Sequence, residues 1–174
     1  MAELQTNLMT KTDAQSELQL VVFNIGAEEF GVEIKKVQEI IRMANITEIP
    51  RAPTYVKGVI NLRGRILVVI SLNVIMGTGC REYDTNTRII IVNIDNTIMG
   101  FIVDSVSEVL HLSSKDIEPA PPLITSKVRS EYLGGVGKLD GRLLILLNID
   151  KMLNAEELQH IQNISPESDE KSAS

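Results

Sequence analysis

The sequence repeats itself, and this repetition is the feature that most limits the folds open to the chain. Residues 24–41 align without a gap to residues 93–110 at an offset of 69. Residues 55–72 align to residues 132–149 at an offset of 77, with seven identities. Because the two blocks recur in the same order, with a Pro-containing connector between them in both halves, the chain is predicted to be an internal duplication.

Each half reads as a series of β-strands. Runs rich in Val and Ile, such as 19–25, lead into polar turns and further apolar runs, which is the signal of a hairpin. The longer runs 59–72 and 136–149 break at Arg63-Gly64 and at Asp140-Gly141. A primed turn needs positive φ, which Gly supplies and Asp tolerates, so the second turn is predicted to suit a hairpin better. These runs are almost continuously apolar, and both faces must therefore be covered, as in small barrels or packed sheets.

The predicted fold class is all-β, with two β-barrel subdomains related by internal duplication, a short C-terminal helix and disordered tails. Asn154 and Glu157 resemble a capping box at the start of that helix, with Leu158 and Ile161 on one face. Residues 77–86, rich in Gly, Thr and charge, are predicted to link the subdomains. The predicted units are an N-terminal tail at 1–17, the first subdomain at 18–80, the second at 81–153, the helix at 154–164 and a tail at 165–174.

Charge and composition exclude several kinds of partner. The formal net charge of -6 lies at the ends, with -2 in residues 1–18 and -4 in residues 154–174. Nucleic acid, which requires clustered Lys and Arg, is therefore not an expected partner. The longest apolar stretch, 59–76, is interrupted by two arginines and a glycine, so no direct membrane insertion is expected. The single cysteine, Cys80, cannot form an internal disulfide, and the two histidines lie too far apart in the sequence for a usual zinc site. We therefore expect a cytoplasmic protein without metal or cofactor.

A search for catalytic residues finds no constellation that suits an enzyme. Asp104-Ser105-Val106 lacks the glycine of the aspartic protease motif, and the first-repeat equivalent of Asp104 is Lys35. The duplication therefore cannot bring two carboxylates together at this position. The spacing of Gly134, Gly135 and Gly137 fits neither phosphate-binding fingerprint. The chain is predicted not to be an enzyme, which leaves binding as its function.

The two repeats differ most at one hairpin tip. Arg63 in the first repeat is replaced by Asp140 in the second, whereas Glu39 is retained as Glu108 within an apolar run. A charge retained there either prevents an edge strand from pairing with another chain or forms an ion pair, with Arg63 as one candidate partner. A solvated turn is the alternative interpretation of the tip.

Several motifs resemble the CheW-type chemotaxis coupling proteins. In the first half these are residues 55–64 (YVKGVINLRG) and 34–40 (IKKVQEI). In the second half they are 104–110 (DSVSEVL), 116–119 (DIEP) and 138–147 (KLDGRLLILL), so the likeness covers about residues 18–153. One departure is that Val68 and Ser71 stand where members often have Pro and Asp.

The resemblance implies two SH3-like five-stranded barrels joined about a groove. It also implies a non-catalytic adaptor that couples transmembrane chemoreceptors to the CheA histidine kinase, located in the cytoplasm and recruited to membrane-associated receptor arrays. The length of the chain favours the free-standing adaptor over the same domain fused to a kinase or a receiver. The alternative is a generic tandem β-barrel protein-binding module in another intracellular complex.

The resemblance also implies two sets of site residues. In the groove, a helical hairpin at the receptor tip would meet Asn61, Arg63, Glu39, Val106 and Val109. The kinase would meet the first barrel at Val37, Glu39 and Gly58. Core packing is the alternative explanation for the three valines.

Overall fold

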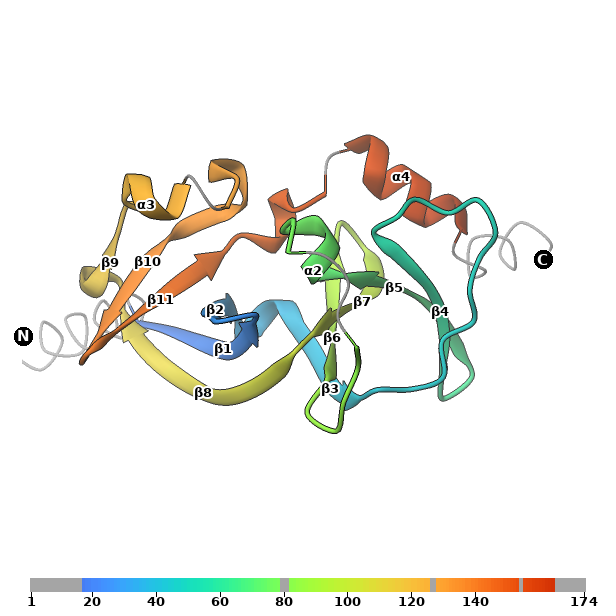
Figure 1. The fold of residues 1–174 in the computed structure, drawn as a ribbon, viewed down its shortest axis with the longest axis horizontal. Coiled ribbons are helices and arrows are strands. Elements are labelled where there is room, and N and C mark those ends of the chain that lie inside the picture. Colours follow the sequence, from blue (N-terminus) through green and yellow to red (C-terminus); the bar gives the residue numbers. More distant parts are fainter. Residues whose placement is uncertain (1–16, 79–81, 126–127, 154, 165–174) are drawn as a thin grey trace, which may run out of the picture.

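The computed structural model describes residues 17–78, 82–125, 128–153 and 155–164, which form two sheets lying side by side (Figure 1). One sheet contains β3 (Val37–Arg42), β4 (Val56–Leu62), β5 (Arg65–Ser71), β6 (Arg88–Ile94) and β7 (Thr97–Val103). The other contains β1 (Glu17–Ile25), β2 (Glu28–Glu33), β8 (Ser105–Ser113), β9 (Ile117–Glu118), β10 (Leu133–Leu139) and β11 (Arg142–Leu147). The predicted all-β class is confirmed.

Each sheet combines strands from both repeats. The strand orders are β3-β6-β7-β5-β4 and β8-β1-β2-β11-β10-β9. The first hairpin of each repeat, β1–β2 or β6–β7, therefore joins the sheet that contains the remaining strands of the other repeat. The boundary at residue 80 therefore separates the sequence repeats but not the two sheets, and residues 18–80 do not build one sheet by themselves. Residues 77–86, predicted to link two subdomains, instead connect β5 and β6 of the same sheet; residues 79–81 lie outside the described part.

Strand registers preserve the duplication. Val22 lies opposite Gly31, and 69 residues further on Ile91 lies opposite Gly100. The hairpins β4–β5 and β10–β11 shift register at the same place, next to Gly58 and Gly135 respectively. The parallel pairing of β5 with β7 is matched by the parallel pairing of β11 with β2. The two halves therefore share one pattern of pairing.

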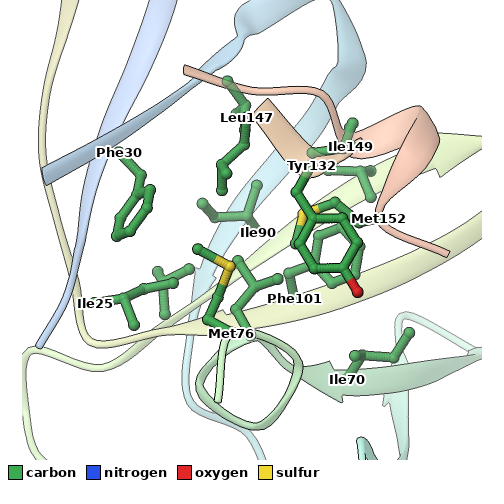
Figure 2. Packing of buried hydrophobic residues seen from close by; sticks show 14 of the residues in the cluster. Ile25, Phe30, Ile70, Met76, Ile90, Phe101, Tyr132, Leu147, Ile149 and Met152 are labelled. Carbon is green, nitrogen blue, oxygen red and sulfur yellow. The ribbon is translucent and has the colours of Figure 1, made fainter. Parts of the chain in front are cut away.

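Both faces of each sheet are buried. On β5, Val68 and Ile70 belong to a large apolar cluster shared by the two sheets, whereas Leu67 and Val69 belong to a cluster within the five-stranded sheet. The six-stranded sheet has its own inner cluster, made by Leu20, Val22, Leu112, Leu144 and Leu146. Figure 2 shows the shared cluster, which includes Phe30 from one sheet and Phe101 from the other. Continuous apolar runs in the sequence thus correspond to strands covered on two sides.

The five-stranded sheet curls so that its edge strands approach each other. Glu39 on β3 is ion-paired with Arg63, which follows β4 at the other edge. Beyond β3, Thr47 and Val59 of β4 exchange two backbone hydrogen bonds, each with an N···O distance of 2.9 Å. This curvature is what the resemblance to five-stranded barrels leads one to expect.

Short helices complete the fold: α2 (Leu72–Ile75), α3 (Pro122–Thr125) and α4 (Ala155–Ile164). The predicted C-terminal helix is present as α4, while Asn154, residues 1–16 and the predicted tail at 165–174 lie outside the described residues. Glu17, assigned to the N-terminal tail in the prediction, is the first residue of β1. Ile161 is fully buried in the shared cluster, and Gln162 Nε2 donates a hydrogen bond of 2.8 Å to Thr97 Oγ1. α4 thus follows the six-stranded sheet in sequence but is hydrogen-bonded to Thr97, the first residue of β7 in the other sheet. No helix among the described residues is long and apolar enough to cross a membrane.

Truncation of Ile161 should test the role of α4 in the shared core. We expect Ile161→Ala to lower the free energy of unfolding by about 2 to 5 kcal/mol, because it leaves a cavity between α4 and the sheets. The neighbouring Gln162→Ala removes one hydrogen bond and should cost only about 0.5 to 1.5 kcal/mol. Urea unfolding of both variants measures the difference, and equal losses would contradict this account of α4.

Candidate functional site

Three predicted site residues, Glu39, Asn61 and Arg63, lie together at one end of the five-stranded sheet. Arg63 Nη1 donates to Glu39 Oε2 at 2.9 Å, and Arg63 Nη2 contacts Glu39 Oε1, so the ion pair is bidentate. The Arg63 side chain remains 69% exposed, against 33% for Glu39. Since exposed ion pairs add little stability, the main effect of this pair is to fix the direction of the guanidinium.

The ion pair also changes the proton affinity of both groups. The hydrogen bond from Arg63, reinforced by its charge, holds the pKa of Glu39 below its ordinary value. The hydrogen bond to Glu39 and the carboxylate charge in turn raise the pKa of Arg63. Both side chains are therefore fully charged at neutral pH.

Asn61 orders the turn that carries Arg63. Asn61 Oδ1 accepts a hydrogen bond of 2.9 Å from the backbone N–H of Gly64. Arg63 and Gly64 both have positive φ, 52° and 86°, as a type I′ hairpin turn requires. Side-chain capping by Asn thus offsets the steric penalty that an arginine meets in the left-handed region.

The equivalent turn of the second repeat differs from the prediction. Gly141 has a φ of 72°, but Asp140 is not in the left-handed region, so the residue pair expected to suit a primed turn does not form one. Lys138 occupies the position of Asn61 and has no oxygen to accept a hydrogen bond from the turn. The side chain that caps the turn, present in Asn61 and absent in Lys138, therefore distinguishes the two turns.

The second repeat binds its retained glutamate in another way. Glu108 Oε2 accepts a hydrogen bond of 2.8 Å from Arg142 Nη2, and Arg142 Nε lies 3.6 Å from Glu29 Oε1. Arg142 aligns with Arg65 rather than with Arg63. The carboxylate is therefore paired in both halves, but only the first repeat holds an arginine at the turn itself.

The predicted valines occupy different environments. Val37 on β3 and Val106 on β8 are half-buried and pack against the shared cluster, which is the core-packing alternative for these two residues. Val109 on β8 is 48% exposed. Val106 and Val109 belong to the six-stranded sheet, while Glu39, Asn61 and Arg63 belong to the other. The predicted receptor-binding set is thus divided between the two sheets.

Gly58 is buried and is required by the backbone. Its φ is 147°, and a Cβ at this position would overlap the carbonyl oxygen of Thr47 and lie 2.8 Å from Ile46 Cγ2. Gly135, its equivalent, has a φ of 114° and would place a Cβ 2.8 Å from the carbonyl oxygen of Glu118. The glycine retained in both repeats therefore allows a close crossing of two chain segments.

Ile40 is an exposed apolar residue that the sequence analysis did not select. It lies on the edge strand β3 and is 36% exposed. Its equivalent at an offset of 69 is Val109, which is also exposed. The repeat alignment contained the signal, because it pairs Ile40 with a residue that had been selected.

No cluster of three or more His, Cys, Asp or Glu side chains is arranged to hold a metal ion within the part of the chain that the structure describes. The retained carboxylates Glu39 and Glu108 are each bound by an arginine instead. The arrangement of charged and apolar groups on edge strands is typical of a surface that binds another protein.

The sequence and the fold together define the class of this protein. The CheW-like domain family matches residues 19–157, and the chain belongs to this family. The resemblance drawn from the motifs is thereby confirmed.

Individual relatives agree with this assignment. The chain is 40% identical to the chemotaxis protein CheW of Klebsiella aerogenes, over 84% of this chain and 88% of the relative. It is 35% identical to the chemotaxis protein CheW of Rhizobium meliloti, over 80% and 89% of the two chains. The crystal structure of the scaffolding protein TtCheW from Thermoanaerobacter tengcongensis matches with a TM-score of 0.73 at 34% identity, covering 80% of this chain and 90% of that one.

The pKa of Glu39 provides a direct test of the ion pair. Because the pKa is lowered in the folded state, the contribution of the pair is present above the ordinary pKa of a glutamate and is lost as the pH falls through the lowered value. Arg63→Ala should raise the pKa of Glu39 towards its ordinary value. NMR titration of the Glu39 side-chain carboxyl carbon measures this change, with Arg142→Ala in the other repeat as the control that leaves Glu39 unaffected. An ordinary pKa for Glu39 in the unmodified protein would refute the pairing.

Replacement of Gly58 should lower the stability of the fold, whether or not a partner is bound. Gly58→Ala is expected to destabilise the protein by at least about 2 kcal/mol, because the backbone is strained for any side chain and the crossing with Thr47 is tight. Gly134→Ala is the control, since no atom lies within 3.7 Å of its Cβ position. Thermal unfolding distinguishes the two, and a Gly58→Ala variant as stable as the control would contradict the structural role.

Proposed function

We propose that this protein is a non-catalytic adaptor of bacterial chemotaxis that couples transmembrane chemoreceptors to a CheA-type histidine kinase. The observation that carries the proposal is the extent of the family match, since 88% to 90% of the length of these relatives is covered. The names of those relatives refer to chemotaxis, and that of the solved structure to a scaffolding protein. The protein acts in the cytoplasm, where receptors and kinase recruit it to membrane-associated arrays.

The receptor contacts the first-repeat hairpin tip. The bidentate bond to Glu39 and the turn capped by Asn61 hold Arg63 in one direction before binding. A preorganised and exposed arginine loses little conformational entropy on binding, and arginine is enriched among residues that dominate interface energies. Val106 and Val109 on β8 supply the apolar part of the surface for a helical hairpin of the receptor.

The kinase contacts the five-stranded sheet at Val37, Glu39 and Gly58. Because Gly58 is buried, its contribution is the shape of the β4 backbone, which a side chain would displace. Glu39 belongs to both contact sets, and its bond to Arg63 connects the two surfaces. Such a shared residue suits an adaptor that holds two partners at once.

Arg63→Asp tests the receptor contact. The substitution introduces the residue that the second repeat carries at this position, and Asp tolerates the left-handed backbone of Arg63. The new carboxylate repels Glu39 and removes the guanidinium. We expect receptor fragments to bind at least about tenfold more weakly, a change of roughly 1.4 kcal/mol, in a pull-down or titration.

The matched control is Arg129→Asp, because the Arg129 side chain is also 69% exposed but lies outside the proposed surface. Purified protein, receptor cytoplasmic fragments and kinase should form a ternary complex with altered kinase autophosphorylation. Binding to neither partner would overturn the proposed function and favour another intracellular complex. Equal loss of receptor binding in both arginine variants would refute the placement of the receptor at Arg63.

A further inference from the structure

The two sheets are joined at two equivalent crossovers. The chain passes from β2 to β3 at Ile34–Lys36 and from β7 to β8 at Asp104. Lys35 and Asp104 align at the repeat offset of 69. Since the crossovers connect edge strands β3 and β8 to the opposite sheet, their geometry sets how the edge strands lie relative to each other.

Asp104 holds one of these crossovers from both sides. Its Oδ2 accepts a hydrogen bond of 2.7 Å from the backbone N–H of Gly26, in the β1–β2 turn of the six-stranded sheet. Its Oδ1 accepts a hydrogen bond of 3.0 Å from Asn73 Nδ2, in α2 at the end of the five-stranded sheet. Its backbone N–H donates to the carbonyl of Asn24 at 3.0 Å. One carboxylate therefore connects the ends of both sheets. The helix α2, which carries Asn73, lies near the centre of the molecule (Figure 1).

Asn73 is oriented for this contact. It is only 5% exposed, and its Oδ1 accepts a hydrogen bond of 2.9 Å from Thr78 Oγ1. With the oxygen engaged by Thr78, the amide nitrogen faces Asp104. Burial strengthens these hydrogen bonds and makes the loss of either partner costly.

The other crossover has a matching contact of different chemistry. Lys36 Nζ lies 2.8 Å from Asp150 Oδ2, and Asp150 aligns with Asn73 at the offset of 77. The hydrogen bond and charge of Asp150 raise the pKa of Lys36. In both halves, a residue two or three positions after the second strand of a hairpin thus contacts the crossover of the other half, although Lys36 lies one position beyond the equivalent of Asp104.

We propose that the hydrogen bond between Asn73 and Asp104, called the pin below, fixes the angle between the two sheets. It thereby positions β8, with Val106 and Val109, relative to the Arg63 end of the five-stranded sheet. Asp104 is a positioning residue in this scheme. The effect of the pin on receptor binding rests on the proposed function; the effect on the sheets does not.

Reversal of the hydrogen-bond direction tests the pin. Asn73→Asp places two carboxylates opposite each other, and their repulsion should open the contact. Adding Asp104→Asn restores it, because the new amide can donate to the carboxylate at position 73 and accept from Gly26. Thr78 still finds an oxygen acceptor in the double variant, so all three hydrogen bonds are retained.

Spin labels measure the result directly. With Cys80 replaced by Ser, one pair of labels at Arg42 and His111 spans the sheets, on the edge strands β3 and β8. A second pair at His111 and Lys138 lies within the six-stranded sheet. Asn73→Asp should shift or broaden the distance distribution of the first pair only, and the double variant should restore it.

An unchanged Arg42–His111 distribution in Asn73→Asp would overturn the proposal. If that variant fails to fold, Asn73→Ala removes the same amide without adding charge, and it should also broaden the distribution; an unchanged distribution again refutes the pin. Receptor binding should weaken severalfold in Asn73→Asp and recover in the double variant, with kinase binding unaffected. Parallel loss of both partners would count against the pin. Failure of the unmodified protein to bind either partner would refute the proposed function alone. The pin would still be tested by the label distances, because these do not depend on a partner.

Discussion

Burial of both faces of each sheet is the constraint on which the rest of the structure depends. The inner face of a sheet is covered by its own curvature, and the outer face is covered by the other sheet through one shared cluster. Buried apolar surface stabilises by about 25 cal/mol per Å², so separating the sheets would forfeit the largest of the three clusters. Curvature, the exchange of hairpins and the docking of α4 all serve this one arrangement.

The apolar runs and the repeat offset predicted the strands, the positions of the turns between them and the equivalence of the two halves, because each of these is a local property of the sequence; the conformation of the Asp140-Gly141 turn was predicted wrongly. It did not predict the exchange of hairpins. Val22 pairs with Gly31 and Ile91 with Gly100 whichever sheet the hairpins join, so local patterns are the same in both topologies. The interpretation of residues 77–86 as a linker failed for this reason, since it assumed that each half closes on itself.

The candidate site was predictable where it depends on charge and unpredictable where it depends on backbone geometry. A glutamate retained in an apolar run and an arginine at the nearby turn suggested an ion pair, and the pair is present. The cap from Asn61 to Gly64 and the crossing at Gly58 depend on φ angles and on segments brought together by folding. Exposure of Val109 and partial burial of Val106 likewise follow from the position of β8 at a sheet edge.

Exchange of the first hairpins has a consequence for how such a protein can arise. A single repeat carries strands for parts of two sheets and can complete neither one alone, but two identical copies can complete both as a symmetric dimer. In that dimer the two hairpin tips would have to carry the same residue, because the copies have one sequence. Fusion of the copies into one chain allows each tip to change independently. A symmetric dimer could not carry Arg63 at one tip and Asp140 at the equivalent position of the other.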